Sequence, residues 1–133
     1  MIYMDDWLES LLSGQQYKKF QETFFGPIGE QYGLSILDIR VLLFLHEHKR
    51  HDTAKDIVEL HHWTKSYVSK SIESLIEGGY LGRKPDASDR RRIHLVLQEN
   101  ARPVIEQVKQ EQIRMLEILF CGISQEEVRV VSQ

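Results

Sequence analysis

The sequence predicts a mainly α-helical chain with one small β-hairpin. Three observations support this fold class. Capping boxes, in which a Ser or Thr precedes an acid by three residues, mark helix starts at Ser35, Thr53 and Ser124. Two short apolar stripes with helical spacing follow each other between residues 53 and 77. Residues 80–97 then contain two strand-like runs around turn-forming residues. A helix pair followed by a hairpin is the element order of a winged helix-turn-helix.

Length and composition favour one globular domain over residues 1–133. The chain is 41% hydrophobic and 28% charged, as soluble proteins are. It contains no run of 18 apolar residues, so no membrane span is predicted. The N-terminus carries Asp5, Asp6 and Glu9 without a basic residue, unlike a signal peptide. The single cysteine, Cys121, cannot form an internal disulfide, which favours a cytoplasmic location.

The first helix is expected from Asp5 to Phe25. Its apolar side chains lie on two different faces, because Leu8, Leu11 and Leu12 share one side whereas Tyr17, Phe20 and Phe24 share another. A helix that is apolar on two faces packs against two partners. The sequence Phe25-Gly26-Pro27 is predicted to end this helix.

Three helices should form the helix-turn-helix part of the chain. The helix after Ser35 stops before His46 and is expected to be buried. The next runs from Thr53 to about Leu60. The third begins at Thr64 and ends at Gly78-Gly79. The side chains expected to point inward from these helices are Ile36, Ile39, Leu42, Leu43, Leu45, Ala54, Ile57, Val58, Val68, Ile72, Leu75 and Ile76.

The hairpin is predicted to pair residues 80–84 with residues 93–97 around a tip of turn formers. A long helix should follow from Asn100 to Phe120. Asn100 is expected to be its cap, which places Pro103 in the first turn, where a missing N–H is harmless. Gly122 is predicted to end this helix, and Ser124 to begin another.

The second helix of the pair and the hairpin tip carry the residues suited to DNA. The N-terminal half of such a helix enters the major groove, and hairpin arginines suit a narrow minor groove. One arginine is expected to pair with Asp86 or Asp89. The predicted DNA-binding residues are Thr53, Thr64, Lys65, Ser66, Ser69, Lys70, Arg83, Lys84, Asp89, Arg90, Arg91 and Arg92.

The distribution of charge agrees with this interpretation. The whole chain has a net charge of −3, yet residues 49–92 contain 10 basic and 7 acidic side chains. Because salt screens charges beyond about 8–10 Å, local charge decides where phosphates bind. A solvated helix face and a solvated hairpin tip are the simpler alternatives for the same residues.

In these segments the chain resembles the MarR (multiple-antibiotic-resistance regulator) family of winged helix-turn-helix repressors. The resemblance rests on residues 53–108 and most specifically on the DxxDRR motif, Asp86 to Arg91. The segment YGLSILDIRVLLFLHEH, Tyr32 to His48, is also similar to the second helix of that family. The sequence departs from the family at Leu97-Gln98-Glu99-Asn100, where Leu-Thr and then Gly are usual.

The resemblance implies a bacterial transcriptional repressor that binds double-stranded DNA as an intertwined homodimer. Residues 1–31 and 100–133 would form the dimerisation helices, and residues 35–97 the winged helix-turn-helix. It also implies release of DNA on binding a small lipophilic or phenolic ligand, or in some relatives a response to oxidants or zinc. The aromatic side chains Phe24, Tyr32, Trp63 and Tyr67 are the candidate ligand contacts, although aromatics at helical spacing more often belong to a core.

Other functions have weaker support in the sequence. The histidines lack the HxxxH or CxxC spacing of a zinc site, so neither a metal nor another cofactor is expected; His61 and His62 are instead candidates for phosphate contacts. Apolar neighbours favour a structural role for Cys121 over a redox role. No phosphate-binding glycine loop or nucleophile with a recognisable base indicates an enzyme. A winged helix that binds proteins rather than DNA and a zinc- or redox-responsive regulator remain alternatives.

Overall fold

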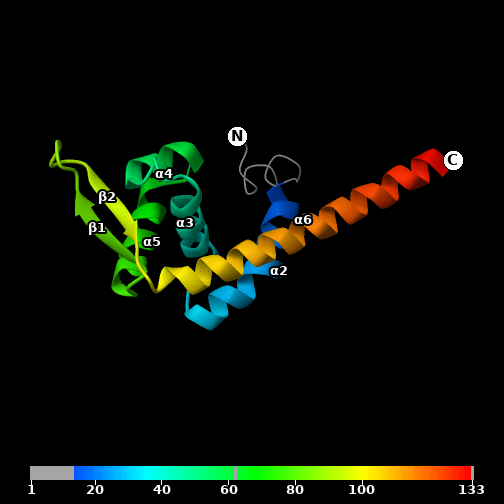
Figure 1. Ribbon diagram of the computed structural model, residues 1–133, viewed down its shortest axis with the longest axis horizontal. Coiled ribbons are helices and arrows are strands. Elements are labelled where there is room, and N and C mark those ends of the chain that lie inside the picture. Colours follow the sequence, from blue (N-terminus) through cyan, green and yellow to red (C-terminus); the bar gives the residue numbers. More distant parts are fainter. Residues whose placement is uncertain (1–13, 62, 133) are drawn as a thin grey trace.

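The computed structural model describes residues 14–61 and 63–132, with side chains as far as residue 118. The described elements are α2 (Gly14–Tyr32), α3 (Ile36–Glu47), α4 (Ala54–His61), α5 (Lys65–Glu77), β1 (Leu81–Pro85), β2 (Ile93–Leu97) and α6 (Ala101–Ser132). The hairpin lies at one end of the molecule, and α6 runs from the hairpin past α2 and α3 to the other end (Figure 1). The predicted class, a mainly α-helical winged helix-turn-helix, is confirmed.

The core is built around α3. Its central residues are almost inaccessible, with Ile39 and Val41 each 0% exposed. It contacts α2, α5, α6 and β2, so it can be apolar on every side, as its sequence is. The capping box at its start is present as predicted, because Ser35 and Asp38 exchange side-chain to backbone bonds of 3.0 Å.

Helix α2 differs from the prediction at its C-terminal end. It continues through Pro27 to Tyr32 and is followed by Gly33, whose φ is +71°. A proline at this position frees the carbonyl four residues earlier, on Thr23, and both residues are exposed. Water can therefore satisfy that carbonyl while Phe25 and Ile28 stay buried on the inner face. The apolar face outweighs the local break.

Helices α4 and α5 begin and end close to the predicted boundaries. Ile57 and Val68 are fully buried, and Leu75 joins them, so both helices present one narrow apolar face to the core. Ala54 was expected to point inward but is exposed at the first residue of α4. Gly79 has a φ of +81° and ends the turn after α5, as the Gly-Gly pair predicts.

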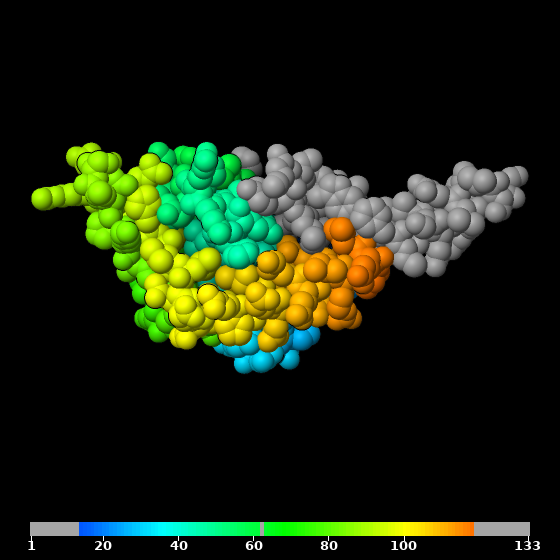
Figure 2. All heavy atoms as spheres, in the orientation of Figure 1, coloured from blue at the N-terminus to red at the C-terminus, as the bar shows by residue number. Residues whose placement is uncertain are grey.

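The hairpin is a two-stranded antiparallel sheet in which Leu81 pairs with Leu97 and Pro85 with Ile93. Only one end of it reaches the core, because Leu81 and Leu95 are buried whereas the residues near the tip are exposed. Figure 2 shows this wing projecting from the body next to α4.

Helix α6 begins at Ala101, so Pro103 lies in its first turn as predicted. Its predicted apolar residues Val104, Ile105, Val108 and Met115 are buried. The predicted break at Gly122 and new start at Ser124 are wrong, because the helix is continuous to Ser132. A glycine inside a helix costs only about 1 kcal/mol relative to alanine, so a single Gly followed by a capping motif does not force a stop.

Several predictions concern parts outside the described residues. They are the apolar face of Leu8, Leu11 and Leu12, the position of His62, and the side-chain environments of Leu119 and Cys121. Within the residues that the structure does describe, no helix is long and apolar enough to cross a membrane.

Candidate nucleic-acid interface

Each of the paired helices begins with a side-chain cap. Thr53 Oγ1 accepts a bond from the N–H of Asp56, whose carboxylate accepts from the N–H of Thr53, both at 3.2 Å. Thr64 Oγ1 accepts from the N–H of Tyr67 at 3.3 Å. Thr53 is only 9% exposed, so its hydroxyl serves the start of α4, whereas the exposed Thr64 lies at the start of α5.

The outer face of α5 is polar and open to solvent. Lys65, Ser66, Ser69 and Lys70 are all exposed, as their positions opposite Val68 and Ile72 predict. Four of the backbone N–H groups at a helix start have no intrahelical partner, so this end also attracts negative charge. The structure therefore presents two ammonium groups and two hydroxyl groups at the positive end of one helix.

The inner face of α5 is fixed by a buried polar contact that the sequence did not reveal. Ser71 is 4% exposed, and its hydroxyl donates to Asp38 Oδ1 at 2.6 Å. The other carboxylate oxygen of Asp38 caps α3. One buried carboxylate thus ties the orientation of α5 to the central helix. The sequence signal was limited to Asp38 as a capping acid, since its partner is 33 residues away.

The wing is joined to α5 by an ion pair between Arg83 of β1 and Glu73 of α5. Both side chains are largely exposed, so the pair contributes little to stability. It does place the guanidinium of Arg83 next to the outer face of α5. Lys84, the next residue of β1, is exposed.

The tip of the wing is ordered by Asp86. Its Oδ2 accepts bonds from the N–H of Ser88 and the N–H of Asp89, both at 3.0 Å, and from the Ser88 hydroxyl at 2.7 Å. Asp89 Oδ1 accepts from the N–H of Arg91 at 3.0 Å. The carboxylates therefore hold the backbone of the turn rather than a guanidinium group, and the predicted pairing of an arginine side chain with either acid is wrong.

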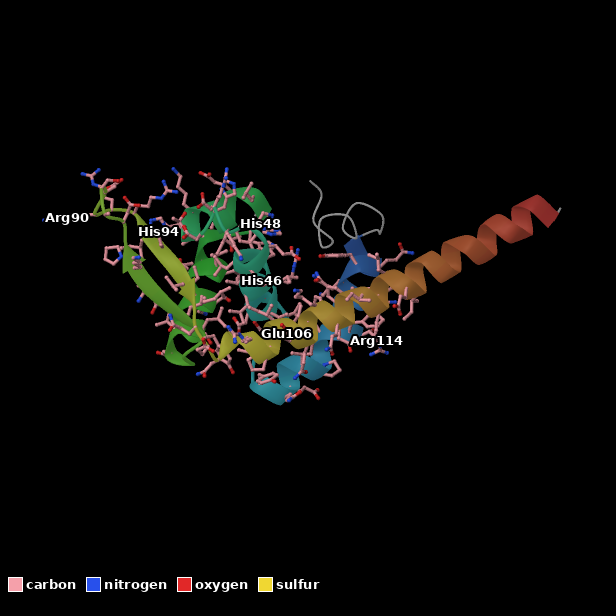
Figure 3. All side chains as sticks on the ribbon, in the orientation of Figure 1. His46, His48, Arg90, His94, Glu106 and Arg114 are labelled. Carbon is pink, nitrogen blue, oxygen red and sulfur yellow. The ribbon has the colours of Figure 1, made fainter. Side chains whose placement is uncertain are left out.

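As a consequence the three consecutive arginines are available at the surface. Arg90, Arg91 and Arg92 are exposed, and within the described part of the chain none has an acidic ion-pair partner. Figure 3 shows Arg90 at the far end of the hairpin, pointing away from the helices. An ordered turn that presents unpaired guanidinium groups is suited to a polyanion.

A groove of about 590 Å³ separates the start of α4 from the wing. Lys55, Arg91 and Arg92 line it together with three acids, Asp56, Glu59 and Asp89, and with Thr53, Ala54 and Ile93. The groove runs from the basic wing tip to the first helix of the pair. Its mixed charge shows that the groove is not uniformly basic, in contrast to the wing tip with its three consecutive arginines.

His94 of β2 is a site residue that the sequence interpretation missed. Its Nδ1 lies 2.6 Å from Asp52 Oδ1 and its Nε2 lies 2.7 Å from Asp86 Oδ1. The bond to Asp52, followed by the bond to Asp86, raises the pKa of His94. His94 in turn is the main cause of the lowered pKa of Asp86. The alternating pattern of β2 indicates only that His94 points away from the apolar face of the strand. The sequence does not reveal its partner Asp52, because Asp52 is 42 residues away.

The four aromatic residues predicted to contact a ligand are not brought together. Phe24 stacks on Phe20 and Tyr32 accepts a bond from Gln107, whereas Trp63 stacks on His61 and lies under Arg40. Tyr67 is 65% exposed on α5. His61 is half-buried among aromatic rings, so it is poorly placed for the suggested phosphate contact.

Two smaller grooves meet at His46, between the end of α3 and α6. One has a volume of about 250 Å³. The other, of about 340 Å³, is lined by His46, Glu47, Lys49, Lys109, Gln112 and Ile113. Burial, followed by the charges of Lys109 and Lys49, lowers the pKa of His46 although Glu106 opposes them. Figure 3 shows His46 and Glu106 in this region.

Gln112 is the unusual member of the second groove. It is 3% exposed, and its Nε2 has no hydrogen-bond partner among the described residues. A buried amide without a partner costs about 1–3 kcal/mol. Among the same described residues, no cluster of three or more His, Cys, Asp or Glu side chains is placed to hold a metal ion.

Comparisons with known proteins agree with this geometry. The model of the MarR family matches residues 32–92, from the end of α2 through the wing tip. MepR from S. aureus, solved in a complex with DNA, is 21% identical over 89% of this chain and 88% of its own, with a TM-score of 0.66. A MarR protein from Peptoclostridium difficile is 23% identical over 90% of this chain and 76% of its own, with a TM-score of 0.72. FabT from Streptococcus pneumoniae, also in complex with DNA, is 23% identical over 89% and 85%, with a TM-score of 0.66. A search of curated proteins gives no significant match.

The fold and the exposed basic face therefore define a winged helix-turn-helix protein. Over residues 32–92 the chain is similar to the MarR family, which agrees with the resemblance inferred from the DxxDRR motif of the wing.

Proposed function

We propose that the chain binds double-stranded DNA and regulates transcription, with α5 in the major groove and the wing in the adjacent minor groove. The observation that carries this proposal is the ordered wing tip, on which Arg90, Arg91 and Arg92 are exposed without acidic partners. Ion pairs between carboxylates and these arginines would argue against DNA binding, because they would neutralise the positive charge of the tip. Here Asp86 and Asp89 bind backbone groups and leave the guanidinium groups to an external anion.

The outer face of α5 would supply the sequence-reading contacts. Lys65 and Lys70 suit phosphates or guanine edges, and Ser66 and Ser69 suit bases or phosphates. Tyr67, which was predicted as a ligand contact, is exposed in the same turn and suits a thymine methyl group or a sugar. Thr53 would act indirectly, through the cap of α4, whereas Thr64 would lie near the DNA backbone.

A homodimer would place two such faces on one operator. In this arrangement the dimerisation helices lie within residues 1–31 and 100–133, and residues 35–97 form the DNA-binding part of a single domain. Ile113 and Ile118 of α6 are 50% and 51% exposed, and a partner chain would cover such apolar surface. Reading helices about 34 Å apart would meet successive major grooves of a pseudo-palindromic site. Such a regulator acts in the cytoplasm, where the DNA is, and the proposal includes no catalytic step.

Binding should depend strongly on salt. Fluorescence anisotropy with the DNA upstream of the chain's own gene should show two chains per operator. If four cations in each chain reach phosphates, log affinity should fall with log salt concentration with a slope of about −7. A scrambled duplex of equal length is the control, and it should bind more weakly at every salt concentration. Equal binding to both duplexes, or no binding at low salt, would contradict the proposal and favour a protein-binding role.

We further propose that the 340 Å³ groove next to His46 receives the effector, a small phenolic or carboxylic anion. Lys49 and Lys109 supply positive charge, and the buried Gln112 supplies an unused N–H donor. The lowered pKa of His46 keeps its imidazole neutral, so that it can also donate or accept. The groove lies between α3 of the DNA-binding part and α6, so a ligand there would bias the separation of the two reading helices.

Replacing Gln112 by leucine tests this groove. Q112L should lower the affinity for 2-hydroxybenzoate at least about tenfold, because a buried donor to an anion is worth about 1.5–3 kcal/mol. The free energy of unfolding should stay equal or rise, since no buried amide is left without a partner. Q110L, at an exposed position of the same helix, is the matched control for calorimetry. Equal 2-hydroxybenzoate affinities of wild type and Q112L would exclude Gln112 from the site.

A further inference from the structure

We propose that His94 is a positioning residue for DNA binding, and that its charged ring locks the wing tip to the helix-turn-helix, so that operator affinity falls as the pH rises. The inference deepens the proposed function and rests on it.

Both nitrogen atoms of the His94 ring face carboxylate oxygens. Nδ1 lies 2.6 Å from Asp52 Oδ1, and Nε2 lies 2.7 Å from Asp86 Oδ1. The three side chains are between 22% and 28% exposed, so the contacts are partly shielded from solvent. An ionised carboxylate can only accept hydrogen bonds, and therefore both ring nitrogens must donate. The geometry is that of an imidazolium between two carboxylates.

The two acids belong to separate parts of the molecule. Asp52 precedes the cap of α4 in the segment between α3 and α4, and its carbonyl also accepts from the N–H of Leu95 at 2.8 Å. Asp86 holds the tip turn through its other oxygen. His94 therefore connects the start of α4 with the turn that carries the arginines. Figure 3 shows His94 on β2 between the helices and the tip.

This connection matters because the wing has few other supports near its tip. An isolated two-stranded hairpin is at best marginally stable in water, and the buried residues of this hairpin, Leu81 and Leu95, lie away from the tip. The bonds of His94 to Asp52 and Asp86 extend the fixed part of the wing toward Arg90. A fixed tip loses less conformational entropy when it binds DNA than a mobile one.

The charge on the ring follows from its surroundings. The charged groups that face His94 are Asp52 from the segment before α4 and Asp86 from the tip, while Lys84 is its cross-strand partner in β1. The two acids raise the pKa of His94 above 6.5, with Asp52 the larger cause. A raised folded-state pKa means that the lock is complete below pH 6.5 and is lost as the pH rises through the folded-state value.

When the His94 ring loses its proton, it also loses one of its two hydrogen bonds to the carboxylates. A neutral imidazole has one N–H and one lone pair, so one of the two carboxylates would face a lone pair instead of a donor. The contact between the lone pair of the ring nitrogen and that carboxylate becomes repulsive. The neutral ring can therefore donate a hydrogen bond to Asp52 or to Asp86, but not to both. DNA phosphates near the tip favour the protonated ring, so binding DNA and binding the proton support each other.

The test combines operator affinity with histidine titration. Anisotropy from pH 6 to pH 9 at fixed salt should show wild-type affinity falling about 5- to 10-fold, within the usual range for coupling between sites. H94Q should remove most of this pH dependence. H51Q is the matched control, because His51 is an exposed histidine in the same connecting segment, and it should keep the wild-type profile.

The variant D52N distinguishes an effect of charge on His94 from a purely structural effect of replacing its side chain. D52N keeps the shape of the partner but removes its charge, so the midpoint of the affinity profile should move to lower pH while the affinity at pH 6 stays within a few-fold of wild type. NMR titration of the DNA-free protein should show the pKa of His94 above the ordinary histidine value of about 6.5 in wild type and closer to that value in D52N.

The possible outcomes are distinct. A wild-type pH profile in H94Q, or a His94 whose pKa lies at or below the ordinary value of about 6.5, would overturn the lock. If the protein fails to bind DNA at any pH, the proposed function fails, and the NMR titration still decides whether His94 is held as an imidazolium between the two acids. If His94 titrates high and H94Q flattens the profile, the inference stands.

Discussion

Reversing the charge of Arg90 and Arg91 together, in R90E/R91E, is expected to abolish operator binding. Groove and phosphate contacts by arginine are worth about 1–3 kcal/mol each, so loss of two corresponds to at least about 30-fold in each chain. Two glutamates at the same positions add repulsion from the phosphates. The fold should persist, because both side chains are exposed at the tip and neither has an ion-pair partner among the described residues. Anisotropy and circular dichroism would measure the two effects.

The matched control is K18E/K19E. Lys18 and Lys19 are adjacent exposed cations on α2, and their reversal changes the net charge by the same amount. Figure 1 places α2 away from the wing. Operator binding by this control should fall only slightly, through the weaker overall field. If R90E/R91E retained wild-type binding, or if the control lost binding equally, the wing would have no specific part in recognition.

Among the single substitutions predicted here, the replacement of Asp38 by alanine should lower the free energy of unfolding the most. D38A removes the acid of the α3 capping box and leaves the buried Ser71 hydroxyl without its acceptor. A lost cap costs about 0.5–2 kcal/mol, and an unsatisfied buried hydroxyl about 1–3 kcal/mol. The free energy of unfolding should therefore fall by about 3 kcal/mol. Urea denaturation at one fixed protein concentration measures this, since association affects apparent stability.

Asp56 provides the control for this prediction. It occupies the equivalent place in the Thr53 capping box but has no contact comparable to the Ser71 bond among its described hydrogen bonds. D56A should cost only about 1 kcal/mol. In a double-mutant cycle, D38A and S71A should couple by about 1.5 kcal/mol or more, because the acceptor is charged. Equal losses for D38A and D56A would show that the Ser71 bond contributes nothing.

D38A also tests how the reading face is held. The Asp38–Ser71 bond fixes α5 to α3 from its inner side, so its loss should lower operator affinity beyond the effect of unfolding. S71A removes the same bond without leaving a buried hydroxyl unsatisfied. The two variants together separate the orientation of α5 from general destabilisation.

The predicted elements that were right depended on strong local signals. Two of the three capping boxes start helices as expected, at Ser35 and Thr53, because each cap is satisfied within four residues. The two errors concern Pro27 and Gly122, which the sequence presents as helix breakers. Tertiary burial of Phe25 and Ile28 outweighs Pro27, and α6 continues through Gly122 because the cost of one glycine is small.

The candidate site divides in the same way. The exposed face of α5 and the arginine tip could be read from periodicity and turn chemistry. The partners of those elements could not. Nothing near His94 in the sequence points to Asp52, and nothing near Ser71 points to Asp38. The four aromatic residues share only their chemical type in the sequence, and the structure places them in separate contacts.

The sequence by itself determined the order of the elements, the resemblance to the MarR family through the wing motif, and the positions of the exposed cations, because these depend on spacing within a few residues. Only the tertiary structure decided which buried or shielded polar groups meet: Asp38 with Ser71, and His94 with Asp52 and Asp86. Hydrogen bonds act over about 3 Å, whereas these partners can be tens of residues apart, so only the folded chain brings them within reach.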